Sequence, residues 1–234
     1  KTLITCGILQ ALVNRGLKVA SFKCGPDYID PMFHSRVIGT RSKNLDAYFV
    51  DEDVLRYLFS RTAIENDISV IEGVMGYYDG ISVGSTEASS CDVAMKLSAP
   101  TVLLINSRGA SISTLATLKG FLEFRPNTIR GVIFNQMSKK VFDQLKPEVE
   151  SMGLVPIGYV PKVSHLVLES RHLGLVLPSE IDELREKLNQ LADILEDSLN
   201  LDALLSLAGT APDMPFGEPE VKEGETVRIG VAAD

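Results

Sequence analysis

The sequence predicts an α/β protein with a doubly wound, mostly parallel β-sheet. Short apolar runs of strand length alternate along the chain with stretches of helical periodicity. Strands that alternate with helices pair in parallel through right-handed crossovers, which favours an open sheet over a sandwich or a barrel. Ligands bind such sheets at the carboxyl ends of the strands. The residues that follow each apolar run are therefore the first candidates for a functional site.

The predicted elements follow in chain order from a helix at the start. Apolar residues recur at helical spacing over residues 3–13, and Gly16 provides a stop signal. Buried strands are predicted at residues 17–22, 68–71, 101–105, 131–135 and 156–160. Residues 181–207 are rich in Leu, Glu, Asp and Lys, and they predict an amphipathic helix or helix pair that forms the last packing layer.

The composition changes after Leu207 and indicates a domain boundary. A proline- and glycine-rich stretch begins there, so we predict one α/β domain over residues 1–207 and a linker over 208–225. Residues 226–232 (TVRIGVA) predict the first strand of another domain, which would occupy 226–234. The first helix lacks the strand that normally precedes such a helix, so we expect the sequence to be a piece of a longer protein.

Composition and charge exclude several classes of function. The formal net charge is −8, which argues against a nucleic-acid partner because a polyanion would be repelled over most of the surface. No apolar run is long enough to span a bilayer, and no signal peptide is visible. The 3 cysteines include no C-x-x-C pair, which argues against a disulfide framework or a zinc site. We expect a cytoplasmic protein with no membrane partner, and the sequence leaves its oligomeric state open, a homodimer included.

Lys1 and Thr2 open the first predicted helix and match the last two residues of the phosphate-binding motif G-x-x-x-x-G-K-[ST]. In an intact loop the lysine reaches the β and γ phosphates of ATP and the hydroxyl binds Mg²⁺. These roles are predicted for Lys1 and Thr2, in a loop truncated before them. An ordinary polar helix start is the alternative.

Acidic residues follow two of the predicted strands. Asp27 and Asp30 lie after the strand at 17–22 in KCGPDYIDP (residues 23–31), and Glu72 directly follows the strand at 68–71. Carboxylates held on rigid turns at a ligand-binding edge suit Mg²⁺, and Lys23 could neutralise phosphate charge. A turn chosen for backbone geometry, or a strand-end acid bound by local N–H groups, would explain the same residues without a metal.

Four colinear motifs carry a family resemblance: KCGPDYIDPMFH (23–34), NLDAYF (44–49), VIEGVMGYYDG (70–80) and GSTEASSCDVAMKLSAPTVLLIN (84–106). They resemble cobyrinic acid a,c-diamide synthases. In that family an ATP-dependent synthetase domain, a P-loop NTPase fold of the dethiobiotin-synthetase type, precedes a class I glutamine amidotransferase domain. RIGVAAD at the end of the chain looks like the start of that second domain.

The resemblance implies a carbon–nitrogen ligase that uses ATP and Mg²⁺. ATP would phosphorylate the a and c side-chain carboxylates of cobyrinic acid, and ammonia from glutamine would replace the phosphate. Similar synthases amidate nickel sirohydrochlorin or hydrogenobyrinic acid. A partitioning or maturation ATPase of related fold is a rival of another class, although GPDYIDP and NLD speak against it.

The resemblance also distributes roles among the candidate residues. The catalytic set is Lys23, Asp27, Asp30 and Glu72, and the metal set is Thr2, Asp27, Asp30 and Glu72. Nucleotide contacts are expected from Lys1, Thr2, Asn135 and Pro161, because dethiobiotin-synthetase-type proteins place an asparagine against adenine where Asn135 lies. The expected substrate contacts are Tyr28, Ile29, His34, Arg41, Asn44, Asp46, Ser85 and Thr86.

Several of these residues have simple structural alternatives. Arg41 and Lys43 could pair with a polycarboxylate substrate, yet a solvated loop explains them equally well. Ser85 and Thr86 open a helix-like segment, where N-capping is the commoner use. His34, His165 and His172 lack metal-ligand spacing, and only His34 lies inside one of the four motifs.

Overall fold

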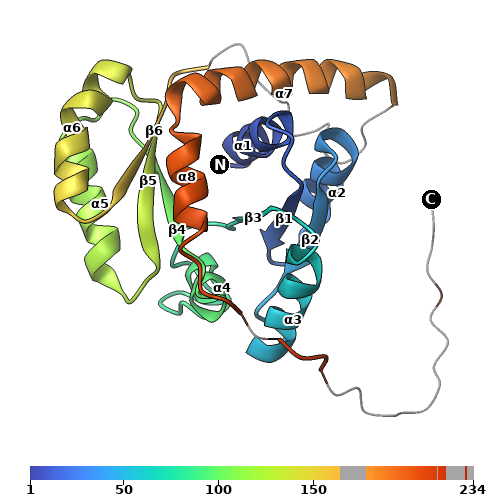
Figure 1. The fold of residues 1–234 in the computed structure, drawn as a ribbon. Helices are drawn as coiled ribbons and strands as arrows, with labels where there is room; N and C mark the ends of the chain where they lie inside the picture. Colours follow the sequence, from blue (N-terminus) through green and yellow to red (C-terminus); the bar gives the residue numbers. More distant parts are fainter. Residues whose placement is uncertain (164–177, 215, 220–229, 231–234) are drawn as a thin grey trace.

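The structure is a computed structural model, and it describes residues 1–163, 178–214, 216–219 and 230 (Figure 1). Some predictions fall on other residues. His165, His172, the segment 169–175 and the strand expected at 226–232 lie outside the described residues.

The predicted α/β architecture with parallel strands is confirmed, and the described strands form two three-stranded sheets. The first sheet has the order β2-β1-β3, built from Arg41–Leu45, Val19–Cys24 and Ile68–Glu72. The second has the order β4-β5-β6, built from Thr101–Asn106, Ile129–Asn135 and Val155–Val160. Every pairing within the two sheets is parallel. Among the described residues no ladder joins β3 to β4, so the single open sheet expected from the sequence is here two separate sheets.

Helices connect and cover the strands. They are α1 (Thr2–Asn14), α2 (Ile29–Phe33), the π-helix η1 (His34–Ile38), α3 (Glu52–Ala63), α4 (Ser90–Lys96), α5 (Ser113–Phe124), α6 (Lys139–Ser151), α7 (Pro178–Ser198) and α8 (Leu201–Ala208). The predicted first helix is α1, and the predicted terminal helix pair is α7 and α8. Figure 1 shows α5 and α6 on one side of the second sheet and α8 on the other.

The largest core cluster forms where α1 packs against α7. Gly7 makes this approach possible, because a Cβ at this position would lie 2.6 Å from Leu195 Cδ1 and 2.8 Å from Leu191 Cγ. Arg15, at the end of α1, pairs with Glu196 of α7 and with Asp202 of α8. These contacts hold α1 against α7 and α8, and Lys1 and Thr2 lie at the start of this helix.

Each sheet also has a core of its own. Phe22 and Leu45 belong to the cluster that α3 and α4 cover on the first sheet, and Phe134 and Leu118 belong to the cluster under α5 and α6. The described start of the predicted linker adds Met214 to the first of these clusters. In the ranges that the structure describes, no helix has both the length and the apolar character needed to cross a bilayer.

Candidate functional site

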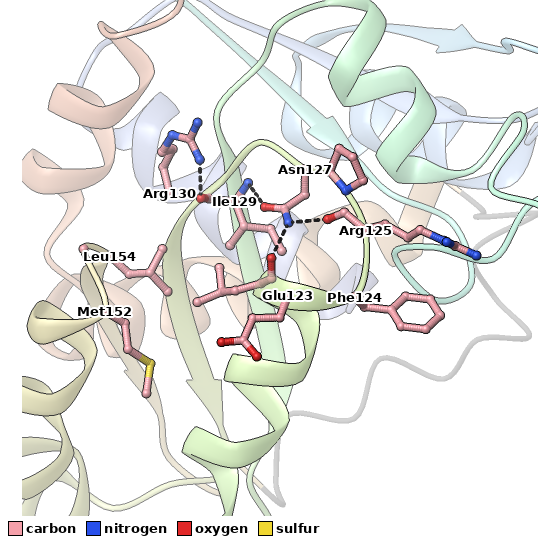
Figure 2. A pocket seen from close by; sticks show the side chains of 11 residues that line it. Glu123, Phe124, Arg125, Asn127, Ile129, Arg130, Met152 and Leu154 are labelled. Carbon is pink, nitrogen blue, oxygen red and sulfur yellow. Dashed lines mark hydrogen bonds between the residues drawn. The ribbon is translucent and has the colours of Figure 1, made fainter.

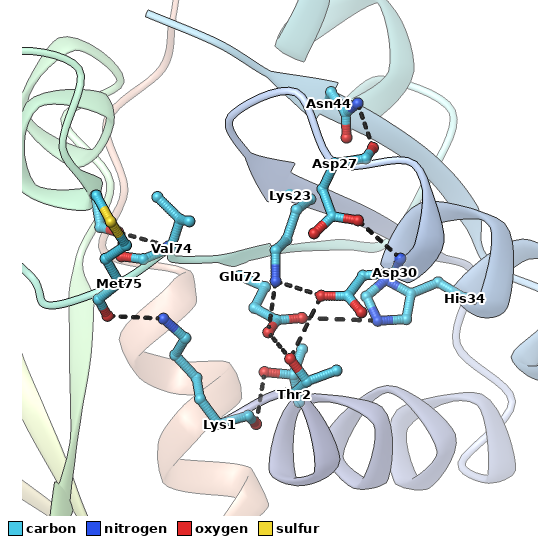
Figure 3. A network of polar contacts seen from close by, with 12 residues as sticks. Lys1, Thr2, Lys23, Asp27, Asp30, His34, Asn44, Glu72, Val74 and Met75 are labelled. Atoms are coloured by element: carbon cyan, nitrogen blue, oxygen red, sulfur yellow. Dashed lines mark hydrogen bonds and ion pairs between the residues drawn. The ribbon is translucent and has the colours of Figure 1, made fainter. Parts of the chain in front are cut away.

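Parallel pairing brings the ends of three strands to one edge of the first sheet. Lys23 of β1 lies in register with Asn44 of β2 on one side and with Glu72 of β3 on the other. The loop after β1 then returns Asp30, in the first turn of α2, over the same edge. Figure 3 shows Lys23, Asp30 and Glu72 converging above the N-terminal end of α1, with Asn44 farther away beside Asp27. The sequence motifs therefore meet where the strand order predicts a ligand site.

A buried ion cluster occupies this edge. The Lys23 ammonium donates hydrogen bonds to Asp30 Oδ2 and, at 2.9 Å, to Glu72 Oε1. Lys23 is 5% exposed and Glu72 is 2% exposed. Burial opposes the charge on Lys23, but the hydrogen bonds and charges of Asp30 and Glu72 outweigh it and raise the pKa of this lysine. Two carboxylates thus share one buried ammonium.

The first residues of α1 complete the cluster. Thr2 Oγ1 donates to Glu72 Oε1 at 2.6 Å and lies 3.4 Å from Asp30 Oδ2. Lys1 Nζ donates to the carbonyl oxygen of Met75 at 3.0 Å. Partial burial, followed by the like charge of Lys23, lowers the pKa of the Lys1 side chain. Two cations, one hydroxyl and two carboxylates therefore lie at the helix start.

Asp27 shapes the loop rather than joining the ion cluster. Its Oδ1 accepts a hydrogen bond from the Asp30 backbone N–H at 3.0 Å, and its carbonyl oxygen accepts one from Asn44 Nδ2 at 2.6 Å. These contacts tie the loop after β1 to the end of β2 (Figure 3). Of the four predicted metal ligands, Thr2, Asp30 and Glu72 converge, whereas Asp27 stabilises the turn that carries Asp30.

The exposed residues near this loop form a second face of the site. Tyr28 is 75% exposed and Ile29 is 43% exposed. Tyr28, Asn44 and Lys43 line a shallow cavity of about 300 Å³ between the loop and β2. Asp46 Oδ1 accepts a hydrogen bond from the Tyr48 N–H and so shapes the turn that follows β2.

Other predicted substrate residues lie elsewhere. Arg41 begins β2 and forms an ion pair with Glu65, away from the strand end that carries Asn44. Ser85 and Thr86 do not open a helix, which corrects that expectation: α4 begins at Ser90, and the Ser89 side chain caps it by accepting from the Asp92 N–H. They belong to the preceding loop.

His34 does not face the surface in this structure. Its side chain is completely buried, and Nε2 lies 3.8 Å from Glu72 Oε2. Burial lowers the pKa of His34, which favours the neutral imidazole. The imidazole thus lies in the protein interior beside the Glu72 carboxylate, and it is not exposed at the surface.

The predicted nucleotide residues Asn135 and Pro161 lie at the carboxyl edge of the second sheet. Asn135 ends β5, in register with Asn106 of β4 and Val160 of β6, and Pro161 directly follows β6. Both are partly buried. The strands of the second sheet end in neutral residues, whereas the corresponding strand ends of the first sheet carry the charged residues Lys23 and Glu72.

Met75, Asp79 and Ser90 shape the loop after Glu72, and none of the three is a candidate from the sequence. Met75 adopts a positive φ of 45°, which turns its carbonyl oxygen toward Lys1. Asp79 Oδ2 accepts from the Gly76 N–H at 2.9 Å and closes the next turn. Ser90 Oγ accepts from the Val74 N–H at 2.8 Å. The Gly and Asp of VMGYYDG, three residues apart, are the signal that could have indicated this turn.

A larger pocket of about 680 Å³ lies at the opposite end of β5 (Figure 2). Its lining includes Arg125, Asn127, Arg130 and Met152. None of the predicted site residues lines it, so its size does not make it the leading candidate.

The residues at the first edge fit a magnesium ion. Thr2, Asp30 and Glu72 offer only oxygen atoms as ligands, which Mg²⁺ prefers, and all three side chains meet within hydrogen-bond distance of one another or of Lys23. No group of three His, Cys, Asp or Glu among the described residues could hold a metal by itself. Mg²⁺ commonly binds one or two carboxylates and completes its shell with water and substrate phosphates. The donor set suits a nucleotide-associated cation.

Comparison with known proteins agrees with this geometry. The pattern of the CobQ/CobB/MinD/ParA nucleotide binding domain matches residues 1–175. The chain belongs to this family. Family membership makes it an α/β P-loop NTPase with a nucleotide-binding domain, as the sequence predicts.

Within the CobQ/CobB/MinD/ParA family, curated relatives of the chain include cobyrinate a,c-diamide synthases. Those from Listeria monocytogenes and Clostridium acetobutylicum are each 39% identical over 100% of this chain and 53% of their own length. The one from Methanocaldococcus jannaschii is 38% identical over 89% of this chain and 48% of its own length. The chain thus spans about half the length of these relatives. A solved structure of the MinC:MinD cell division protein complex from Aquifex aeolicus is 16% identical, with a TM-score of 0.49, and covers 93% of this chain and 94% of that chain.

Proposed function

We propose that the chain is the ATP-dependent synthetase domain of a cobyrinate a,c-diamide synthase. It would activate the a and c side-chain carboxylates of cobyrinic acid, and ammonia from glutamine would convert each to an amide. The single observation that supports this most is the buried cluster of Thr2, Lys23, Asp30 and Glu72 at a P-loop helix start. The relatives named cobyrinate a,c-diamide synthase supply the substrate class.

The reaction needs charge stabilisation more than a protein nucleophile. An oxygen of the substrate carboxylate attacks the γ-phosphorus of ATP, ADP leaves, and the resulting acyl phosphate loses phosphate when ammonia attacks its carbonyl carbon. Thr2, Asp30 and Glu72 would hold Mg²⁺, which when bound neutralises phosphate charge. Lys1 and Lys23 would oppose the charge on the transferred phosphoryl group.

The exposed face of the loop after β1 would receive the macrocycle. Tyr28 and Ile29 lie between Asp27 and Asp30 in the chain, at the start of α2, and both side chains are exposed and offer apolar surface. The shallow cavity that Asn44 lines would bind a side-chain carboxyl or amide of the substrate. This arrangement would place a carboxylate near the phosphate without burying the whole macrocycle.

The second sheet would bind the neutral part of the nucleotide. Asn135 and Pro161 lie at its carboxyl edge, where an amide side chain suits the edge of an adenine base. The proposed layout is a synthetase domain at 1–207, a linker at 208–225 and the start of a class I glutamine amidotransferase domain at 226–234. Glutamine would act through that second domain.

The test is product analysis with the full-length protein. Incubation with Mg²⁺, ATP, glutamine and cobyrinic acid should yield a macrocycle with two new amides, detected by mass spectrometry. Nickel sirohydrochlorin and hydrogenobyrinic acid, offered in parallel, test the same chemistry on other macrocycles. ATP turnover that ignores every macrocycle would contradict the proposal and favour a partitioning or maturation ATPase.

A further inference from the structure

His34 is the most poorly satisfied polar side chain beside the candidate site. It is 0% exposed, and neither Nδ1 nor Nε2 has a hydrogen-bond partner among the described residues. A buried polar group without a partner costs about 1 to 3 kcal/mol, so a buried imidazole with two free nitrogens needs a reason. Its location provides one.

The other unsatisfied atom in the site faces the same imidazole. Glu72 Oε1 accepts from both Thr2 and Lys23, whereas Glu72 Oε2 is buried and has no partner in the described part of the chain. His34 Nε2 lies 3.8 Å from that oxygen. An N–H···O hydrogen bond needs about 2.9 Å, so a movement of about 1 Å would give His34 Nε2 and Glu72 Oε2 a partner in each other, while His34 Nδ1 would keep none among the described residues. Figure 3 shows the imidazole beside the Glu72 carboxylate, joined by a dashed line to the oxygen that Lys23 does not contact.

The backbone holds His34 firmly in this position. It begins the π-helix η1, a rare element that often marks functional sites. Its carbonyl oxygen accepts from the N–H groups of Gly39 at 3.0 Å and Thr40 at 3.1 Å, and from Thr40 Oγ1 at 3.2 Å. Gly39 has a φ of 87°, which favours glycine there. The backbone that carries the imidazole is therefore held in a fixed turn.

We propose that His34 is a positioning residue for Glu72: its neutral imidazole donates Nε2–H to Glu72 Oε2 and so holds the carboxylate with Oε1 toward Thr2 and Lys23, in the orientation in which Glu72 would bind Mg²⁺. Outer partners of this kind orient a ligating carboxylate, and their loss typically lowers metal affinity by about 10- to 100-fold. This inference rests on the proposed function of the site, because it assigns His34 a role only through Glu72.

The test compares three variants of the full-length protein by direct Mn²⁺ binding in the presence of ATP and by the Mg²⁺ concentration that gives half-maximal amidation. His34→Phe removes the donor and should weaken metal binding roughly 10- to 100-fold. His34→Gln can place an amide N–H near the position of Nε2 and should restore most of that loss. The KM for the macrocycle should stay unchanged in both.

Thr114→Val is the matched control. Thr114 Oγ1 is also buried without a partner in the described residues, but it lies on α5 beside the second sheet. This variant should leave metal binding unchanged. If His34→Phe does not fold, His34→Asn takes its place, because its shorter amide cannot reach the position of Nε2 and should bind metal more weakly than His34→Gln.

The outcomes separate the two proposals. Wild-type protein that binds neither ATP nor the metal overturns the proposed function itself. Wild-type binding that is unchanged in His34→Phe, or equal losses in His34→Gln and His34→Asn, overturns the role of His34 alone.

Discussion

The two three-stranded sheets have the same parallel architecture but end in different chemistry. At the carboxyl edge of the first sheet, Lys23 and Glu72 lie in register, and both are almost fully buried. At the same edge of the second sheet, Asn106 and Asn135 lie in register and are neutral. Strand topology alone therefore places a ligand edge, and the residue types at the strand ends decide what that edge can do.

The difference has a physical reason in the elements that cover each edge. The loop after β1 and the start of α1 close over Lys23 and Glu72, so their charges need partners: Lys23 pairs with both Asp30 and Glu72, and the Thr2 hydroxyl donates a hydrogen bond to Glu72. Charged groups are rarely buried without such partners. We infer a division of work, in which the first sheet would bind phosphate and metal and the second would bind the neutral base of the nucleotide.

The largest expected effect is on turnover when the first edge loses a carboxylate. Glu72→Gln keeps the size of the side chain but removes the charge that Thr2 and Lys23 contact. Amidation by the full-length protein should fall by on the order of 10²-fold or more, measured as kcat. Glu148→Gln, on the exposed surface of α6, is the control and should leave kcat unchanged. Equal effects of the two changes would contradict the role of Glu72.

The next largest effect is expected on the free energy of unfolding when the buried ion cluster loses its lysine. Lys23→Met leaves the Asp30 and Glu72 carboxylates buried without their shared ammonium, so the free energy of unfolding should fall by about 3 to 5 kcal/mol. Denaturant titration measures it. Lys139→Met, which removes an exposed ion pair with Asp143 beside the second sheet, should not shift the midpoint. A Lys23→Met variant as stable as wild type would show that the cluster is hydrated and weak.

A smaller effect is expected at the second edge. Asn135→Ala should raise the KM for ATP by about 3- to 10-fold, the value of one hydrogen bond, and leave kcat at saturating ATP unchanged. Steady-state kinetics at varied ATP measures both. Asn127→Ala, at the opposite end of β5, is the control. A fall in kcat with no change in the KM for ATP would contradict a role of Asn135 in nucleotide binding.

The smallest expected effect concerns alkaline pH. The pKa of Lys23 is raised in the folded protein, so its contribution to stability is complete below the pKa of an unfolded lysine, about 10.4, and is lost as pH rises through the higher folded value. The stability difference between wild type and Lys23→Met should therefore stay constant near neutral pH and shrink only in strong alkali. A difference that shrinks near neutral pH would contradict the raised pKa.

The sequence predicts the buried strands well because they carry an apolar signal. It misses β2, whose residues Arg41–Leu45 (RSKNL) are mostly polar and exposed. Among the strands that the structure describes, β2 lies at the sheet edge beside β1 only, so no continuous apolar run is required. The break between β3 and β4 also leaves no mark in the sequence, because hydrogen bonds between strands are not encoded in periodicity.

The candidate site is predictable where strand ends carry charge. Lys23 and Glu72 were identifiable because each ends an apolar run, and Asp30 because its motif places it on the returning loop. The burial of His34 could not be predicted, since it depends on a π-helix that starts at that residue. Nor could Asp27 be separated from Asp30, because the distinction is which carboxylate caps the turn.

The most direct test of the division between the two edges is ATP binding by the full-length protein, measured calorimetrically with and without Mg²⁺. Glu72→Gln should remove most of the gain in affinity that Mg²⁺ brings, whereas Asn135→Ala should weaken binding equally in both conditions. If Asn135→Ala abolishes the Mg²⁺ dependence, or Glu72→Gln leaves it intact, the division is contradicted.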